Sequence, residues 1–86
     1  MDAEWTGALV KPDVTIDALG QYCPMPIIMT SKKIKELKLG QVVEVLSDDV
    51  GIKKDMPAWC KSTQHEYIGL IEAEGIYRAY VRKARE

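Results

Sequence analysis

Apolar residues alternate with polar ones from Asp13 up to Gly20. A period of two is typical of a strand with one buried face, so the pattern predicts a first strand in this segment. Residues 1–12 show no such period and end at a proline. We therefore expect a flexible N-terminal leader over residues 1–12 and a single domain over residues 13–86. The alternating apolar positions are Val14, Ile16 and Ala18.

The next segment predicts a helix over residues 24–38. Its apolar residues recur every three or four positions, which places them on one helical face. Two prolines at the start fit the first helical turn, where backbone N–H groups have no intrahelical partner. Gly40 follows as a stop signal. The recurring positions are Ile27, Thr30, Ile34 and Leu37.

The middle of the chain predicts a second strand and a second helix. Residues 41–47 are rich in valine and leucine, which is typical of a strand covered on at least one face. Residues 51–64 show a helical stripe, but Pro57 falls at an interior position. Unless Asp55 caps a new start, we expect a short helix with an irregular first turn.

The C-terminal part predicts two strands, over residues 65–74 and 76–83, joined by a turn at Glu74-Gly75. The element order is then strand, helix, strand, helix, strand, strand. This order predicts an α/β fold: a two-layer sandwich, βαβαββ, with a mixed four-stranded sheet and both helices on one face.

Composition narrows the possible partners. Twelve basic and thirteen acidic residues leave a formal charge of -1, so no general basic field attracts nucleic acid or an anionic membrane. The longest apolar stretch is far shorter than the roughly 20 residues of a membrane span. The N-terminus has no basic segment followed by an apolar block, so we expect a cytoplasmic protein without a membrane anchor and without direct nucleic-acid binding.

Cys23 is the residue with the most reactive setting. A cysteine directly before a helix faces unpaired N–H groups and the positive end of the helix dipole, and both stabilise a thiolate. Pro24 and Pro26 have no N–H, so Met25 and Ile27 are the nearest donors. No second cysteine completes a C-x-x-C pair, so a sulfur atom held on Cys23 as a persulfide would persist until a partner arrives.

The residues alone leave another interpretation of Cys23 open, in which it is a small buried residue at a loop-to-helix junction. Cys60 is a possible second thiol, as a sulfur station or as a disulfide partner of Cys23, or it simply packs against the sheet. A zinc site built from Cys23, Cys60 and His65 is not expected, because their spacing matches no compact ligand pair.

Acidic residues near Cys23 are interpreted as structural. Asp17 is expected to support the Cys23 loop by accepting backbone N–H bonds, and Asp48-Asp49 are expected to be turn and capping residues. The sequence contains no nucleotide-binding loop or hydrolase motif, so we expect no bound cofactor and no metal.

Residues 17–26, with the sequence DALGQYCPMP, match every defined position of a D-x-x-G-x-x-C-P-x-P signature. On this signature, and over about residues 13–83, the chain resembles the TusA/SirA-like sulfur-carrier family. The resemblance maps the acceptor cysteine onto Cys23 and the proline pair onto Pro24 and Pro26, with Asp17 and Gly20 as supporting positions.

This resemblance implies a two-layer α/β sandwich and a sulfurtransferase that relays sulfur as a cysteine persulfide. The implied partners are a donor, either a cysteine desulfurase or a rhodanese, and an acceptor protein. The implied pathways are tRNA thiolation, cofactor synthesis or sulfur-compound metabolism. A different hypothesis remains open, in which the chain is a redox-sensing or regulatory interaction module that uses Cys23 and Cys60.

Overall fold

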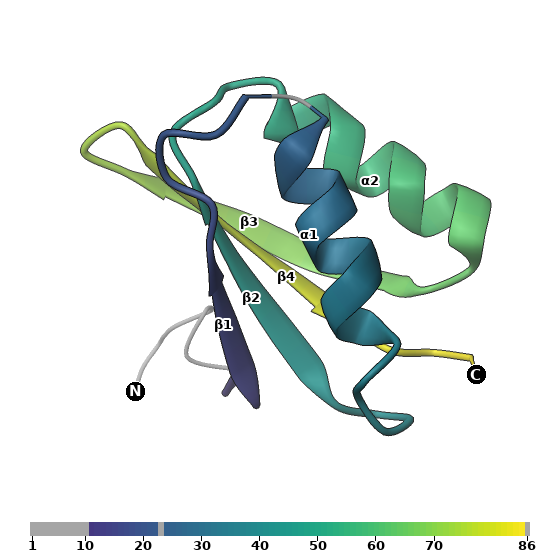
Figure 1. Cartoon of the computed structure of the whole chain (residues 1–86). Helices are drawn as coiled ribbons and strands as arrows, with labels where there is room; N and C mark the ends of the chain where they lie inside the picture. Colours follow the sequence, from purple (N-terminus) through teal and green to yellow (C-terminus); the bar gives the residue numbers. More distant parts are fainter. Residues whose placement is uncertain (1–10, 23, 86) are drawn as a thin grey trace.

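The computed structural model describes residues 11–22 and 24–85. Figure 1 shows a four-stranded sheet with both helices packed on one face, which confirms the predicted two-layer βαβαββ sandwich. Neither described helix has the length and apolar content needed to span a bilayer. The elements are β1 (Val14–Asp17), α1 (Met25–Ile34), β2 (Val42–Ser47), α2 (Ile52–Thr63), β3 (Glu66–Ala73) and β4 (Ile76–Arg82).

The sheet is mixed, with the strand order β1-β2-β4-β3. β1 and β2 are parallel, because α1 carries the chain back across the sheet between them. β4 is antiparallel to both of its neighbours, β2 and β3. The β3–β4 ladder shifts register between Tyr67 and Gly69. The topology therefore places the carboxyl ends of β1 and β2 side by side at one edge of the sheet.

The core lies between the sheet and the two helices. The alternation of β2 sends Val43 and Val45 inward, where both are fully buried, and they share one core cluster with Met56 of α2. Buried apolar surface in such a core stabilises a fold by roughly 25 cal/mol per Å². The other members of the core are Ile16, Ala18, Ile34, Ile52, Cys60, Tyr77, Ala79 and Val81.

α1 is shorter than the predicted segment of residues 24–38, ending at Ile34. The next residues continue as tight turns, in which the N–H of Glu36 bonds to the Lys33 carbonyl and that of Leu37 to the Ile34 carbonyl. In these bonds the acceptor lies three residues before the donor, as in a 3₁₀-helix, whereas in an α-helix it lies four residues before. The periodicity of apolar residues continues through such turns, so it overestimated the helix at its C-terminal end.

α2 is continuous through Pro57, which lies inside the helix. The predicted irregularity is present in the first turn, where N–H groups of Ile52, Lys53 and Lys54 bond to carbonyls three residues earlier. Pro57 removes one further helical bond. Packing of the buried face of α2 on the sheet maintains the helix despite this loss.

The two C-terminal strands form the predicted hairpin. Ala73 pairs with Ile76 across a two-residue loop, and both loop residues have positive φ, 54° at Glu74 and 79° at Gly75. Positive φ at both positions is the type I′ geometry that suits the twist of a hairpin. His65 lies before β3, although the prediction placed it in the strand.

Candidate functional site

Two loops meet at the sheet edge where β1 and β2 end, and both lead directly into helices. Figure 1 shows the β1–α1 loop and the β2–α2 loop next to each other at this edge, with the first turns of α1 and α2 beside them. The carboxyl end of parallel strands is a common position for binding and catalytic sites in α/β proteins. Here it contains residues 18–22 and 24, which flank Cys23 in the sequence.

Asp17 and Gly20 shape the first of these loops. The Asp17 carboxylate accepts the Leu19 N–H (3.0 Å), which turns the chain as it leaves β1. Gly20 has φ of +78°, a conformation that side-chain-bearing residues rarely adopt, and no atom lies within 4 Å of where its Cβ would be. Backbone conformation, rather than space, therefore accounts for glycine at this position.

Asp48 links the two loops. Its two carboxylate oxygens accept the N–H of Gly20, each at 3.2 Å. The following residue, Asp49, accepts the N–H of Gly51, the residue that caps α2. Both carboxylates thus act through backbone groups, as turn and capping residues do. The link from Asp48 to the Cys23 loop was not foreseen, since nothing in the sequence shows which loops face each other.

The start of α1 is rigid but offers fewer N–H donors than the sequence suggested. Pro24 is the N-cap and Pro26 lies buried in the first turn. The predicted donor Met25 already donates its N–H to the Tyr22 carbonyl (2.8 Å). The expectation that Met25 serves a thiolate was therefore wrong, because a turn of the loop itself uses this group.

Helix dipoles favour an anion at this edge. An α-helix carries roughly half a positive charge at its N-terminus, and no acidic side chain lies in the first turn of α1 to offset it. α2 also begins at this edge, but its first turn contains Asp55. Pro26 and Asp55 line the same small space between the helices, so the Asp55 carboxylate opposes part of this effect.

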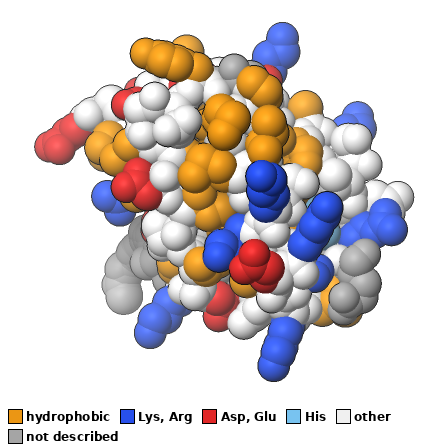
Figure 2. Space-filling model, in the orientation of Figure 1, with side chains coloured by type: hydrophobic (Ala, Val, Ile, Leu, Met, Phe, Trp, Pro, Cys, Tyr) orange, Lys and Arg blue, Asp and Glu red, His pale blue; other side chains and the backbone are white. Residues whose placement is uncertain are grey.

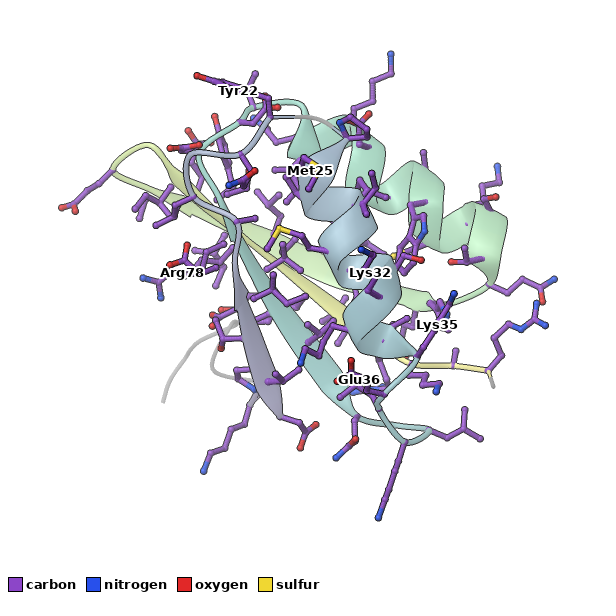
Figure 3. The ribbon with its side chains drawn as sticks, in the orientation of Figure 1. Tyr22, Met25, Lys32, Lys35, Glu36 and Arg78 are labelled. Atoms are coloured by element: carbon purple, nitrogen blue, oxygen red, sulfur yellow. The ribbon has the colours of Figure 1, made fainter. Side chains whose placement is uncertain are left out.

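Large hydrophobic side chains are exposed around the two loops. Of the seven exposed large hydrophobic side chains among the described residues, five lie in these loops or at the start of α1. Figure 2 shows hydrophobic side chains gathered over this upper part of the molecule, with lysine and arginine side chains mainly around the lower part. Figure 3 shows Tyr22 and Met25 projecting there. We call this surface the loop patch; it consists of Leu19, Tyr22, Met25, Ile28 and Val50.

Cys23, the predicted sulfur-bearing residue, lies outside the described residues. Its described neighbours Tyr22 and Pro24 are both exposed, Tyr22 with 76% of its surface open to solvent. Among the described site residues, Asp17 ends β1, Gly20 and Pro24 lie in the loop that follows, and Pro26 is buried in the first turn of α1.

Cys60 lies in the core rather than at this edge. Only 2% of its surface is exposed, and burial raises the pKa of its thiol to about 11. It follows Ile52 by eight residues in α2, which corresponds to about 12 Å along the helix axis. A disulfide requires Cα atoms within about 7 Å. The burial of Cys60, its protonated thiol and its distance from the start of α2 all disfavour a disulfide with a thiol at the start of α1.

His65 has a structural partner: its Nδ1 accepts the N–H of Ala84 (3.2 Å), and its ring stacks on Trp59. Burial, followed by the charges of Arg85 and Lys83, lowers the pKa of this imidazole. Within residues 11–22 and 24–85, no group of His, Cys, Asp and Glu side chains is arranged to hold a metal ion.

Comparisons with known proteins agree with the fold and extend over most of the chain. The profile of the family described as Sulfurtransferase TusA matches residues 14–83. Putative sulfur carrier protein YrkF of Bacillus subtilis is 48% identical over 79 residues, which cover 91% of this chain but only 42% of YrkF. A putative sulfur carrier protein of Archaeoglobus fulgidus is 40% identical over 72 residues, covering 84% of this chain and 99% of the relative.

A solved structure of a SirA-like protein from Desulfitobacterium hafniense is similar throughout its length. Its TM-score with this chain is 0.74 at 30% sequence identity, and the alignment covers 84% of this chain and 99% of the SirA-like protein. The sheet and both helices therefore have a counterpart in an experimental structure.

Proposed function

The chain belongs to the TusA family of sulfurtransferases, and on this basis we propose that it is a sulfur carrier that holds sulfane sulfur as a persulfide on Cys23. The observation that carries the proposal is the exposure of Tyr22 and Met25, which flank Cys23-Pro24 in the sequence, at the start of α1. A persulfide is an anion at neutral pH, and the N-terminus of a helix stabilises an anion.

The proposed transfer conserves electrons. The Cys23 thiolate attacks the outer sulfur of a donor cysteine persulfide, the donor S–S bond breaks, and the donor thiolate leaves. In the second step an acceptor thiolate attacks the outer sulfur on Cys23 in the same way. The proposed transfer uses no cofactor. The chain positions the Cys23 sulfur, leaves it open to the partner's cysteine and stabilises its negative charge.

Rigid positioning of the loop supports this role. The Gly20–Asp48 link and the two prolines restrict the backbone on both sides of Cys23. A restricted loop loses little conformational entropy when it meets a partner, which favours brief and repeated encounters. A cysteine that only fills space in the core would not require such a restricted loop.

The loop patch supports docking of protein partners. Exposed apolar side chains that surround a reactive position are typical of the centre of a protein–protein interface. We propose that a sulfur donor, of the cysteine desulfurase or rhodanese class, and a sulfur acceptor contact this patch in turn. The proposed destinations are tRNA thiolation, cofactor synthesis or sulfur-compound metabolism.

Sulfur loading tests the proposal directly. Incubation of the purified chain with a cysteine desulfurase and cysteine should add the mass of one sulfur atom, and peptide mapping should place it on Cys23. The Cys23→Ala variant should not be loaded, whereas Cys60→Ala, the matched control, should be loaded as the wild type is. Unchanged loading of Cys23→Ala would sink the proposal.

A further inference from the structure

A second candidate site lies at the opposite end of the helices from the Cys23 loop. A groove of about 470 Å³ opens where the last turns of α1 and α2 meet the C-terminal segment after β4. Small-molecule sites in proteins are typically about 300–1,000 Å³, so the groove has sufficient volume for a small ligand. We call it the helix-end groove; its lining includes Lys35, Trp59, His65, Lys83 and Arg85.

Positive charge dominates the helix-end groove. Lys35, Lys83 and Arg85 contribute three cations, and no acidic residue is among the described residues that line it. Within residues 11–22 and 24–85, the ion pairs of the chain do not include Lys35 or Arg85. Figure 3 shows Lys35, the residue that follows α1, projecting toward the side on which α2 lies.

Helix ends offset only part of this charge. Each helix carries roughly half a negative charge at its C-terminus, so two helices contribute about one negative charge, which is less than the two positive charges of the exposed Lys35 and Arg85. Lys83 is mostly buried, and its Nζ donates to the carbonyl of Leu37 (2.7 Å), in the turns that follow α1. Lys35 and Arg85 are exposed, so they are the cations that a ligand can contact.

An aromatic surface lies beside these cations. The rings of Trp59 and His65 are stacked, with centroids 5.5 Å apart and planes inclined by 30°. Both side chains are half-buried, and Ile34 adds an apolar surface to the same lining. The groove thus combines a flat apolar wall with two exposed cations, Lys35 and Arg85, the second of which also donates to the side-chain oxygen of Gln64 (3.3 Å). An apolar wall and positive charge are the two features that recognise a flat ring attached to an anionic group.

From this combination we infer that the helix-end groove binds a small phosphate-bearing ligand with a flat ring, of the size and chemistry of a nucleoside monophosphate. Arg85 and Lys35 hold the phosphate, and Trp59 packs against the ring. The small volume and the net charge of -1 favour a small molecule over a nucleic-acid strand, which requires a longer basic surface.

His65 provides a built-in reporter of occupancy, since it is the chain's single histidine. Its pKa is lowered by burial first and then by Arg85 and Lys83. A phosphate held by Arg85 neutralises the charge of that residue, so the pKa of His65 should rise toward its ordinary value. A ligand bound elsewhere leaves this pKa unchanged.

The experiment is an NMR titration of the full ¹⁵N-labelled chain with adenosine 5′-monophosphate (AMP), with adenosine and inorganic phosphate as comparison probes. AMP should shift the Trp59 indole N–H and the Arg85 amide saturably, with a dissociation constant of about 1 mM or lower. Adenosine should bind about tenfold more weakly, because it lacks the charge that the cations hold. Absence of a saturable AMP shift, or equal binding of adenosine, would overturn the inference.

Matched variants separate this site from general electrostatic attraction. The double variant Lys35→Gln/Arg85→Gln should weaken AMP binding about tenfold. Lys32→Gln/Lys61→Gln removes the same charge from exposed positions outside the lining and should leave binding within about twofold of the wild type. Equal weakening by both variants would contradict a specific site. A short RNA that displaces AMP and binds about tenfold more tightly would overturn the small-ligand assignment.

Discussion

Asp48 shows how a single carboxylate supports a site from a neighbouring loop. Both of its oxygens accept one backbone N–H, that of Gly20, three residues before Cys23. Charge-assisted bonds to backbone groups are stronger than neutral ones. In the proposed sulfur transfer Asp48 is therefore a positioning residue, which acts only through the loop.

We predict that Asp48→Ala slows sulfur loading of Cys23 several-fold while lowering the free energy of unfolding by about 1 kcal/mol. Asp48→Asn keeps one acceptor oxygen and should recover part of the loading rate. Loading is followed by mass spectrometry, and stability by urea unfolding. If Asp48→Ala loads at the wild-type rate, the link has no part in transfer.

The thiol of Cys60 illustrates how burial suppresses reactivity. With a pKa of about 11, only about one Cys60 thiol in a thousand is ionised near pH 8. The thiolate is the nucleophile in alkylation and exchange. We predict that the Cys23→Ala variant, which retains Cys60, reacts with iodoacetamide only as fast as the chain unfolds.

The measurement is the alkylation rate of Cys23→Ala in native buffer and in urea, read by mass spectrometry. The rate should rise steeply across the unfolding transition, because unfolding exposes the thiol and returns its pKa to the ordinary range. Rapid alkylation of the folded variant would instead show that Cys60 is accessible and would revive its role as a second sulfur station.

At the scale of elements, the hydrophobic period predicts each strand and helix, because one face of each is buried against a shared core. It does not predict where α1 ends, since turns after Ile34 continue the same spacing of apolar residues. At Pro57 the local preference predicts an interrupted helix, but packing of the buried face of α2 keeps the helix continuous.

The β3–β4 hairpin contains a residue that is poorly matched to its conformation. Glu74 adopts φ of 54°, whereas asparagine and glycine are the residues that tolerate this region best. We predict that Glu74→Asn raises the free energy of unfolding by about 0.5–1 kcal/mol. Glu74→Gln removes the same charge without the conformational preference and serves as the control in urea unfolding. An equal effect of both substitutions would assign the change to charge instead.

The parts of the candidate site differ in how far the sequence predicts them. Asp17, Gly20, Pro24 and Pro26 lie within ten consecutive residues, from the end of β1 to the first turn of α1, so a local signature identifies them. No local signature identifies the helix-end groove, because its lining residues come from the ends of α1 and α2 and from the C-terminal segment. Only the tertiary fold brings those segments together.

At the scale of the whole molecule, His65 makes stability depend on pH. Its pKa is lowered in the folded chain by burial and by Arg85 and Lys83, so the unfolded chain binds a proton more readily. The contribution of His65 is fully present above the unfolded pKa of about 6.5 and is lost as pH falls from there through the folded pKa.

We predict that the free energy of unfolding decreases more between about pH 7.5 and pH 5.5 in the wild type than in His65→Gln. Urea unfolding at several pH values measures this difference. His65→Gln also lacks the ring that stacks on Trp59, so the comparison concerns the slope with pH and not the absolute stability. Parallel slopes would show that His65 does not govern the loss.

The shift of register in β3 also bears on how copies of this chain behave toward one another. β1 and β3 are the two outer strands of the sheet, and unpaired backbone groups on an outer strand invite a strand from another molecule. β1 spans only four residues, and the bulge between Tyr67 and Gly69 interrupts the regular spacing along β3. Both features discourage edge-to-edge aggregation, a useful property for a carrier that exposes an apolar patch to its partners.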